Sequence, residues 1–401
     1  MRLLFVADGR SPTTLSWLRH WLETEHEVHL VSTFPCDAPP GVASFHVLPV
    51  AFSGLVGGQM AVHSARPHRR NLVGRFRSLL VPLRYLLGPL SLPPHQQHFR
   101  TLVASIQPDL VHALRIPFEG MLATATPAGT PLIVSIWGND LTLHAHGSWW
   151  MANLTRAVLR RADGLMADAE RDIRLAREWG LPASRPTLVV PGAGGIHLEE
   201  VTSSKSGRLP EELPQGPIVV NARGQRPGSL RQDVFFQSIP LVLEKVPQAI
   251  FVCPPLKGDA EAERWVEKLG IQAHTRLWPP LMEQSQLWTL FNRAQVYVSP
   301  SIHDGTPNSL LESMFCGCFP VVGNIESLRA WVQDGTNGLL VDANSPSALA
   351  AAIVTALQNP ALREAAKKEN ARIIAERAEY GRCMAMAEAF YLKVLEDPQG
   401  L

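Results

Sequence analysis

Two carboxylates beside one expected helix start could do chemistry together. Asp304 and Glu312 are eight residues apart in VYVSPSIHDGTPNSLLESMFCGCFPVV, residues 296–322, a pattern that predicts strand, loop, helix and strand. We expect Thr306 to be the N-cap and Pro307 the first helical residue. The N–H groups that follow, backed by the positive helix end, suit a phosphate or diphosphate. The residues expected around that ligand are Gly305, Thr306, Asn308, Ser309 and Leu310.

A simple anion site does not explain the two acids, because both would repel a negative ligand. They fit a ligand that carries hydroxyl groups on either side of its phosphates, since an ionised carboxylate accepts hydrogen bonds from two neighbouring hydroxyls. Glu312 would then hold a ribose diol and Asp304 a sugar. The alternative is that Asp304 caps the helix and Glu312 lies on its surface.

The composition bounds the class of protein. A chain of 401 residues with 46% hydrophobic and 18% charged positions is neither disordered nor fibrous,. A net charge of +1 gives no global field for a nucleic-acid partner,. The five cysteines show no paired CxxC spacing, so we expect a reduced, cytosolic protein with neither a zinc site nor a disulfide framework.

Alternation of short apolar runs with helix-length segments predicts α/β domains with mainly parallel sheets. Residues 201–217 lose this periodicity and collect Ser, Pro and Gly, as linkers do,. We expect one domain over 1–204, a second over 205–375, and a C-terminal helix over 376–401 that packs toward the first. The expected strands are residues 3–7, 27–32, 109–114, 131–137, 164–169, 187–192, 217–223, 249–254, 296–301, 319–324 and 338–342.

A stretch without acidic residues extends from Asp37 to Asp109 and contains seven arginines. On a helical wheel, the apolar residues of 72–87 share one arc with arginines at its margins, as in helices that lie in a membrane interface. The lack of acids suits anionic lipid. The alternative is a surface helix packed on its own domain. The arginines expected to face the membrane are Arg75, Arg77 and Arg84.

Several blocks together resemble the family 4 (group 1) glycosyltransferases, which are retaining enzymes of the GT-B fold that use nucleotide-sugar donors. The segment from Asp304 to Glu312 is similar to the E-x7-E region of that family. The resemblance covers most of residues 105–345 and, more weakly, 1–35. It implies two Rossmann-like domains facing a central cleft, with the C-terminal helix crossing back to the first. The other similar blocks are DLVHALR, SIWGNDL, TLVVPGAGG, VVNAR, RAQVYVSPS and DGTNGLLV.

The resemblance assigns roles on the donor side. It implies that Glu312 binds ribose and that Asp304 contacts the donor sugar, at a position where the family usually has Glu. It also implies that Arg223 and a second cation neutralise the donor diphosphate. Arg231 falls within one residue of the family's Lys, with Arg226 as a substitute; arginine keeps the charge and adds a fork suited to phosphate.

The first half has matching positions with less defined roles. Gly9 matches a loop that faces the donor phosphates, although a strand-to-helix turn also favours glycine for backbone reasons,. Trp137 stands where many relatives have His, so it would shape a sugar or lipid subsite by stacking, or fill the core. Asp140 in the same turn and His112 at a strand end are further acceptor-side candidates; a structural role is the alternative for His112.

We therefore expect a retaining hexosyltransferase that moves a sugar from a nucleotide sugar to a hydroxyl of a lipid-linked or glycan acceptor in cell-envelope polysaccharide or glycolipid synthesis. The resemblance implies a front-face route in which the departing phosphate oxygen takes the acceptor proton. No metal or other cofactor is expected, and we expect peripheral attachment to the inner face of an anionic membrane. The alternatives are a GT-B nucleotide-sugar epimerase and a non-catalytic nucleotide-sugar-binding partner subunit.

Overall fold

Two compact units make up the protein. The computed structural model describes residues 1–55, 83–204, 207–279 and 283–396. Met1–Gly194 with Cys383–Leu401 form one unit, here called the N-domain, and Gly195–Arg382 form the other, the C-domain. The division therefore lies at 194/195, before the expected 204/205. Its cause is that Ile196 and Val201 are buried in the C-domain core.

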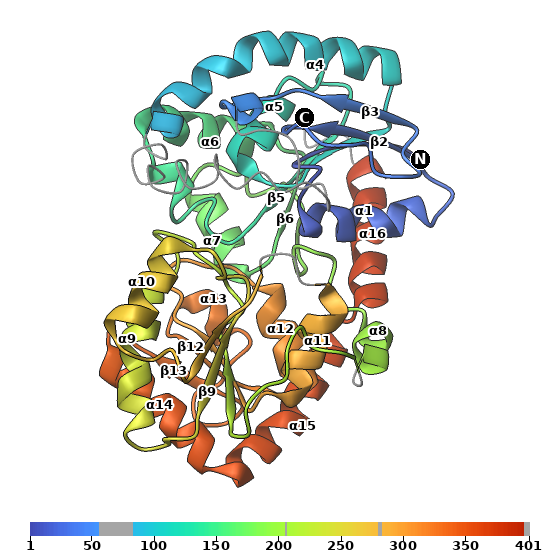
Figure 1. Cartoon of the computed structure of the whole chain (residues 1–401). Helices are drawn as coiled ribbons and strands as arrows, with labels where there is room; N and C mark the ends of the chain where they lie inside the picture. The colour runs from blue at the N-terminus through green and yellow to red at the C-terminus, as the bar shows by residue number, and fades with distance from the viewer. Residues whose placement is uncertain (56–82, 205–206, 280–282, 397–401) are drawn as a thin grey trace. The chain divides into compact units, whose positions relative to one another are not determined.

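The N-domain contains a seven-stranded parallel sheet in the order β3-β2-β1-β4-β5-β6-β7. Helices alternate with these strands along the chain (Figure 1). The central strands are buried from end to end because a parallel sheet is covered on both faces,. The strands are β1 (Arg2–Ala7), β2 (Glu27–Ser32), β3 (Ser44–Val47), β4 (Leu110–Ala113), β5 (Leu132–Ile136), β6 (Gly164–Ala167) and β7 (Thr187–Val189). The helices are α1 (Pro12–Leu22), α4 (Leu92–Ile106), α5 (Met121–Ala123), α6 (Trp149–Arg161) and α7 (Glu170–Glu178).

The C-domain contains a six-stranded parallel sheet in the order β10-β9-β8-β11-β12-β13. Alternate residues of its strands face two separate cores: Val219 and Phe251 face one, Val220 and Val252 the other,. The strands are β8 (Ile218–Val220), β9 (Ile250–Cys253), β10 (Thr275–Leu277), β11 (Val296–Ser299), β12 (Phe319–Gly323) and β13 (Leu339–Val341). The helices are α8 (Leu198–Ser203), α9 (Gln232–Leu243), α10 (Ala260–Lys268), α11 (Gln284–Arg293), α12 (Asn308–Cys316), α13 (Glu326–Arg329), α14 (Pro346–Gln358) and α15 (Pro360–Arg377).

The predicted fold class is confirmed: the chain is α/β, with two domains built on parallel sheets. Each predicted strand overlaps an observed one, with ends that differ by up to three residues. The prediction missed β3 and β10, which are the outermost strands at one edge of each sheet. Both are short, and TRL in β10 has little of the apolar character by which a buried strand is recognised,.

The last helix, α16 (Tyr380–Glu396), belongs to the N-domain from Cys383 onward and completes its core. Tyr391 stacks on Trp21 with ring centroids 4.5 Å apart. Its hydroxyl accepts from Trp17 Nε1 at 3.3 Å. These aromatic rings fill space beside β1 and β4, so a segment from the end of the chain stabilises its beginning.

Gly323, the last residue of β12, allows the β11–α12 loop to pass close by. A Cβ at this position would lie 2.0 Å from the Ser301 carbonyl oxygen and 3.0 Å from its N. We therefore expect Gly323→Ala to destabilise the C-domain by on the order of 1–3 kcal/mol, as overpacking against backbone does. Urea unfolding measures this. Gly129→Ala is the control, because nothing lies within 4 Å of its added Cβ; equal midpoints for both variants would contradict the expectation.

Candidate functional site

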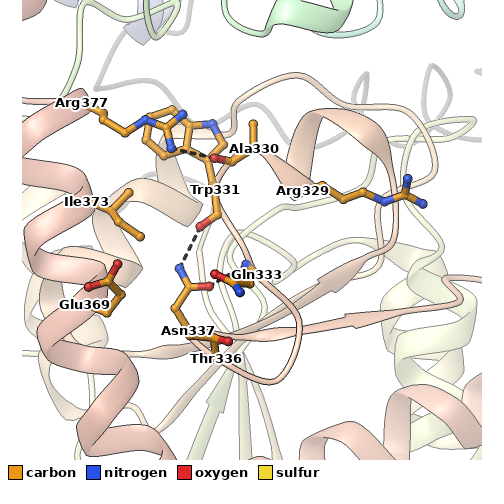
Figure 2. A pocket seen from close by; sticks show the side chains of 9 residues that line it. All are labelled: Arg329, Ala330, Trp331, Gln333, Thr336, Asn337, Glu369, Ile373 and Arg377. Atoms are coloured by element: carbon orange, nitrogen blue, oxygen red, sulfur yellow. Dashed lines mark hydrogen bonds between the residues drawn. The ribbon is translucent and has the colours of Figure 1, made fainter.

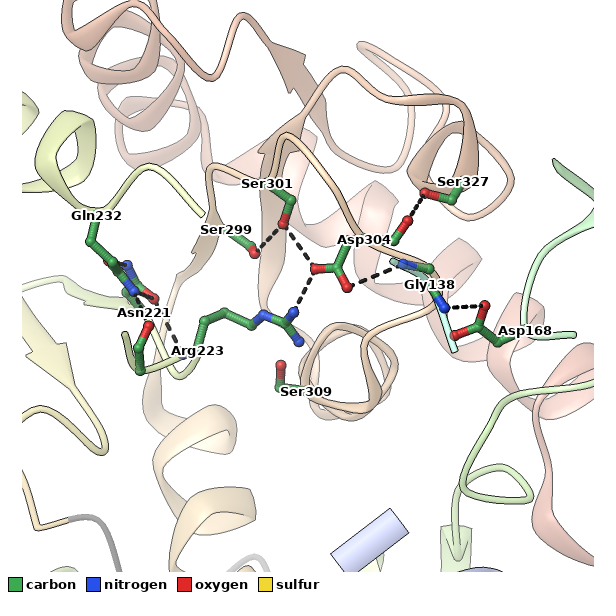
Figure 3. Close-up of polar contacts among 12 residues, drawn as sticks. Gly138, Asp168, Asn221, Arg223, Gln232, Ser299, Ser301, Asp304, Ser309 and Ser327 are labelled. Carbon is green, nitrogen blue, oxygen red and sulfur yellow. Dashed lines mark hydrogen bonds and ion pairs between the residues drawn. The ribbon is translucent and has the colours of Figure 1, made fainter. Parts of the chain in front are cut away.

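A buried ion pair joins two separate segments of the C-domain. Arg223 follows β8, and Asp304 lies in the loop between β11 and α12. Arg223 Nη2 donates to Asp304 Oδ2 at 2.5 Å, and the two side chains are only 7% and 12% exposed (Figure 3). The structure thus brings together two residues that the sequence predicted to act on one ligand. Each charge limits the desolvation cost of the other.

Serine hydroxyls hold the Asp304 loop in place. Ser301 Oγ donates to Asp304 Oδ2 at 3.1 Å and contacts Ser299 Oγ at 3.0 Å. Ser327 Oγ donates to the Asp304 backbone oxygen at 2.7 Å (Figure 3). The other carboxylate oxygen, Oδ1, accepts from Gly305 N at 3.1 Å. These serines were not among the predicted site residues, although their positions around the end of β11 are visible in the sequence.

An amide pair fixes the turn that carries Arg223. Asn221 Nδ2 donates to Gln232 Oε1 at 2.7 Å, and Gln232 Nε2 donates to Gly224 O at 2.7 Å. Arg223 N donates to Asn221 Oδ1 at 3.3 Å (Figure 3). With its backbone held, Arg223 still has a buried Nε without an acceptor among the described residues. A buried donor of this kind has hydrogen-bonding capacity for an anionic ligand.

The start of α12 differs by one residue from the prediction. Pro307, with extended φ/ψ of −69° and 124°, is the N-cap, and Asn308 begins the helix. Thr306 is therefore not the cap; its Oγ1 accepts from Trp331 Nε1 at 3.0 Å. Leu310 N already donates to Pro307 O at 3.0 Å. This leaves Asn308 and Ser309 as the α12 N–H groups without an acceptor in the described chain.

Glu312 is buried one turn into α12. The residue is 8% exposed, and its Oε1 accepts from Gln284 Nε2 at 2.5 Å. Burial raises the pKa of Glu312 to about 7, although donors from Trp288 and Gln284 partly offset this effect. Gln284 begins α11 and was absent from the sequence prediction, because nothing local connects it to a residue 28 positions away. The alternative prediction, that Glu312 lies on the helix surface, is therefore wrong.

Arg231, the expected second cation, has its guanidinium engaged elsewhere. Its Nε and Nη2 donate to the two oxygens of Asp233 at 2.9 and 2.8 Å, and Nη1 contacts Asn344. The pair is about one-third exposed on both sides. Asp233 is only two residues away, so this local capture was available to sequence reasoning. Arg226, the substitute, is exposed.

Gly9 in the N-domain is explained by packing. A Cβ there would lie 2.8 Å from Cys36 Sγ and 3.1 Å from Ser32 Oγ. Gly9 N donates to that same Ser32 Oγ at 3.1 Å, so its N–H is occupied. The neighbouring Arg10 is paired with Asp8 through two contacts of 3.0 Å. This loop has a structural reason for its glycine, and a role at donor phosphates stays a prediction.

Asp140 organises the turn after β5. The residue is fully buried, and its carboxylate accepts from Arg115 Nη2 at 2.8 Å, Ile116 N at 3.0 Å and Trp137 N at 3.3 Å. Both oxygens are used within the domain, so Asp140 positions the residues around it. The Trp137 ring lies against Gly192, whose added Cβ would be 3.1 Å from it. Trp137 is half-buried and its Nε1 has no acceptor among the described residues.

His112 is a core residue of the N-domain. It is fully buried in β4, its Nδ1 is 2.5 Å from Tyr391 Oη, and its Nε2 is 2.8 Å from Ser135 Oγ. Burial lowers its pKa to about 3, so the ring is neutral at ordinary pH. His112 therefore has a structural role, which was the alternative to an acceptor-side role. The acceptor-side expectation failed because the partner hydroxyl is 279 residues away in sequence.

The predicted membrane arginines fall in two groups. Arg75 and Arg77 lie outside the described residues. Arg84 stacks on two rings of its own domain, with Cζ 4.9 Å from the Phe118 centroid and 5.7 Å from that of Phe34. Its guanidinium is thus directed into the domain, so the expectation that it faces lipid is wrong. Residues 83–87 are helical, as the periodicity predicted.

A cavity of about 190 Å³ lies between α13 and α15 (Figure 2). One wall is Trp331, whose Nε1 also donates to Thr306, the residue before the N-cap of α12. Arg377 Cζ lies 4.4 Å from the Trp331 ring, so this cation is already stacked. None of the predicted donor-side carboxylates lines the cavity. The lining residues are Arg329, Ala330, Trp331, Gln333, Thr336, Asn337, Glu369, Ile373 and Arg377.

Comparison with known proteins identifies the fold and the family. Sucrose-phosphate synthase from Thermosynechococcus elongatus aligns with a TM-score of 0.70 at 15% identity, over 98% of this chain and 99% of that one. Anabaena Alr3699/HepE, solved with UDP and glucose, aligns with a TM-score of 0.69 at 14% identity over the same shares, 98% and 99%. Two α/β domains of this kind define a GT-B glycosyltransferase fold.

Family models match both domains. The model described as "Glycosyl transferase 4-like domain" matches residues 8–192, and that described as "Glycosyl transferases group 1" matches residues 224–373. The chain belongs to the group 1, or family 4, glycosyltransferases. D-inositol 3-phosphate glycosyltransferase of Streptomyces avermitilis is 24% identical over 216 residues, which are 51% of this chain and 46% of that protein. The chain spans about half the length of the curated relatives it matches.

The raised pKa of Glu312 predicts a stability that depends on pH. The folded protein holds this proton up to about pH 7, whereas an unfolded glutamate releases it near 4.5. The bound proton therefore contributes most to the free energy of unfolding below pH 4.5, and this contribution is lost as the pH rises to 7. We expect Glu312→Gln to exceed the wild type in stability by on the order of 1–3 kcal/mol at pH 8, and to converge with it near pH 5.

Urea unfolding at pH 5, 6, 7 and 8 measures the difference. Glu364→Gln is the matched control, because Glu364 is an exposed carboxyl of the same domain. A constant gap between wild type and Glu312→Gln at all four pH values would contradict the expectation.

Proposed function

We propose that the protein transfers a hexose, with retention, from a nucleotide sugar to a hydroxyl of a lipid-linked or glycan acceptor in cell-envelope polysaccharide or glycolipid synthesis. The observation that carries this proposal is the buried Arg223–Asp304 pair in the C-domain of a group 1 glycosyltransferase. The same domain places a second buried carboxylate, Glu312, one turn inside α12.

The donor half of the proposal assigns one task to each group. Glu312, when ionised, accepts from the ribose hydroxyls. Arg223 donates to the diphosphate through the guanidinium that Asp304 orients, and the N–H groups of Asn308 and Ser309 add donors at a positive helix end,. Asp304 Oδ1, bonded to Gly305 N, faces the sugar hydroxyls.

The chemical step balances without a protein base. The anomeric C–O bond to the diphosphate breaks, and the acceptor oxygen bonds to the anomeric carbon on the same face. The acceptor proton passes to the departing phosphate oxygen. Arg223 stabilises the charge that develops on that oxygen, where a preorganised donor lowers the barrier most. In this proposal arginine and helix N–H groups compensate the diphosphate charge, and no metal is required.

The similar proteins support this substrate class. One structural neighbour was solved with UDP and glucose, another with UDP and GlcNAc, and the curated relatives are named as glycosyltransferases acting on an inositol phosphate. These properties belong to those proteins. For this chain, a nucleotide sugar as donor and a polyol or glycan hydroxyl as acceptor follow as a proposal.

An exposed apolar surface of the N-domain supports peripheral attachment to a membrane. Trp149 and Trp150, at the start of α6, are 72% and 47% exposed. Ser148 Oγ donates to Tyr85 O at 2.8 Å, which holds α6 beside the helical residues 83–87. We name this surface the apolar patch. Its members are Leu83, Leu86, Leu87, Leu90, Trp149 and Trp150.

Tryptophan and leucine together suit the interface of a bilayer, where an apolar ring body and a polar N–H both find partners. The acid-free stretch before Asp109 adds no negative charge that would repel anionic lipid,. No helix among the described residues is long and apolar enough to cross a membrane. We propose a peripheral enzyme on the inner face of the membrane, consistent with five cysteines that are all unpaired.

Donor binding is tested by titrating UDP-, GDP- and ADP-sugars in thermal shift and calorimetry, because a ligand of the folded state raises its stability. We expect one nucleotide to bind. Glu312→Ala should weaken it about ten- to a hundredfold, the value of a charged hydrogen-bond acceptor. Glu364→Ala is the control. Wild-type affinity in Glu312→Ala would remove the ribose assignment.

Product analysis then separates transfer from its rivals. Free nucleotide together with an α-configured product of an α-linked donor supports retaining transfer. An epimerised nucleotide sugar would indicate an epimerase, and an unchanged donor that binds tightly would indicate a binding subunit.

Membrane attachment is tested with vesicles of phosphatidylcholine, with and without phosphatidylglycerol. We expect sedimentation with anionic vesicles and a several-fold loss in the Trp149→Ser, Trp150→Ser double variant, because two exposed rings no longer enter the interface. Met386→Ser with Leu392→Ser is the matched control, since both are exposed apolar residues of α16. Equal losses in both double variants, or no sedimentation of the wild type, would contradict the proposal.

A further inference from the structure

An arginine of the N-domain is half-buried and forms no ion pair with the residues that the structure describes. Arg84 Cζ lies over the Phe118 ring at 4.9 Å and 5.7 Å from that of Phe34. Its Nε is inaccessible to solvent and has no acceptor among the described residues. Burial lowers the pKa of Arg84, and the nearby Glu119 only partly counters this effect. A buried cation with an unused donor is costly unless a ligand uses it.

A second arginine of the N-domain also has an unused Nε donor. Arg115, after β4, gives Nη2 to Asp140 at 2.8 Å, while its Nε is buried without an acceptor among the described residues. Its side chain is 29% exposed, so one part of the guanidinium is accessible. Arg84 lies over the ring of Phe118, which follows Arg115 by three residues, and the charge of Arg115 also lowers the pKa of Arg84.

The local charges do not balance. Of the acids near Arg84 and Arg115, Asp140 is paired with Arg115 and Asp8 with Arg10, which leaves Glu119. Glu119 accepts from Thr33 Oγ1 at 2.8 Å, and burial raises its pKa to about 7. Near neutral pH it is therefore half protonated. The described residues leave a net positive charge between Arg84 and Arg115.

The backbone that holds this arrangement is strained. Phe118 has φ of +69° and ψ of −40°, a conformation that a bulky side chain rarely adopts,. Gly88 allows the 83–87 helix to approach, since an added Cβ would lie 2.9 Å from the Phe118 ring. On the other side, Tyr85 Oη is 2.6 Å from His144 Nδ1. Such strain persists where the surroundings over-determine it, often at ligand sites.

We propose that Arg84 and Arg115 form a site for a phosphomonoester carried by the acceptor. The site rests on the proposed function, because it supplies the acceptor's class: a phosphorylated polyol, a sugar phosphate or a lipid headgroup that ends in a phosphomonoester. Two guanidinium groups with unused Nε donors suit the several oxygens of a phosphate and its charge of nearly −2. Tyr85 and His144, bonded to each other beside the pair, add polar atoms for the hydroxyls of such an acceptor.

The test uses glycerol 3-phosphate as a soluble probe, glycerol as the uncharged control, and vesicles with or without phosphatidic acid as the lipid arm. Calorimetry and vesicle sedimentation are run on the wild type, Arg84→Gln, Arg84→Lys and Arg160→Gln. Arg160 is an exposed arginine on α6 of the same domain. Excess UDP is present throughout to occupy the donor site, and its own binding is measured first.

We expect glycerol 3-phosphate to bind the wild type and Arg160→Gln equally, and glycerol not to bind. Arg84→Gln should bind the phosphate at least tenfold more weakly, with UDP affinity unchanged. Arg84→Lys keeps the charge and loses the fork, so an intermediate loss is expected; it also serves if Arg84→Gln does not fold. Binding to phosphatidic acid alone, lost in Arg84→Gln, would identify a lipid headgroup as the source.

Wild-type affinity of Arg84→Gln for both probes, or binding of neither probe by the wild type, would overturn the proposal. Failure of UDP to bind would instead count against the donor site, and is read separately.

Discussion

The Arg223–Asp304 pair is the interaction on which the arrangement of the proposed donor site in the C-domain depends. Removing a carboxylate and a guanidinium from water costs several kcal/mol for each ion, and only close contact with further hydrogen bonds offsets this. The C-domain supplies a close contact, since the two charged groups are 2.5 Å apart. It also supplies further hydrogen bonds: Ser301 Oγ donates to Asp304, and Arg223 N donates to the side-chain amide of Asn221. Because the pair joins the end of β8 to the loop before α12, losing either partner would leave a buried charge and release both segments.

Burial separates the ionisable groups that fit a ligand from those that serve the fold. Arg231 and Asp233 neutralise each other at the surface and need nothing further. Glu312 is buried and Arg84 half-buried, both with incomplete charge compensation, which lowers stability in the absence of a ligand. Proteins retain such costs at functional sites, where a stability-optimised sequence would have removed them. His112 shows the opposite case, a buried ring that is neutral and bonded on both nitrogens.

The sequence predicted what depends on local periodicity and missed what depends on distant partners. Buried strands and the positions of Asp304 and Glu312 could be inferred, because apolar runs and a loop before a helix are local signals. The partners of His112 and Glu312, Tyr391 and Gln284, could not, since they lie 279 and 28 residues away. The observed N-cap of α12 is one residue later than the predicted one, because the extended ψ of Pro307 keeps that residue out of the helix.

The two N-domain proposals meet on the helical residues 83–87. Leu83, Leu86 and Leu87 are exposed, whereas Arg84 is directed onto Phe118. One short helix would thus present apolar side chains to a bilayer, while its Arg84 is directed to the interior of its own domain. A phospholipid acceptor would satisfy both: its chains would stay with the leucines and Trp149, and its phosphate would meet Arg84. A soluble sugar phosphate would need only the arginine, and the apolar patch would then serve attachment alone.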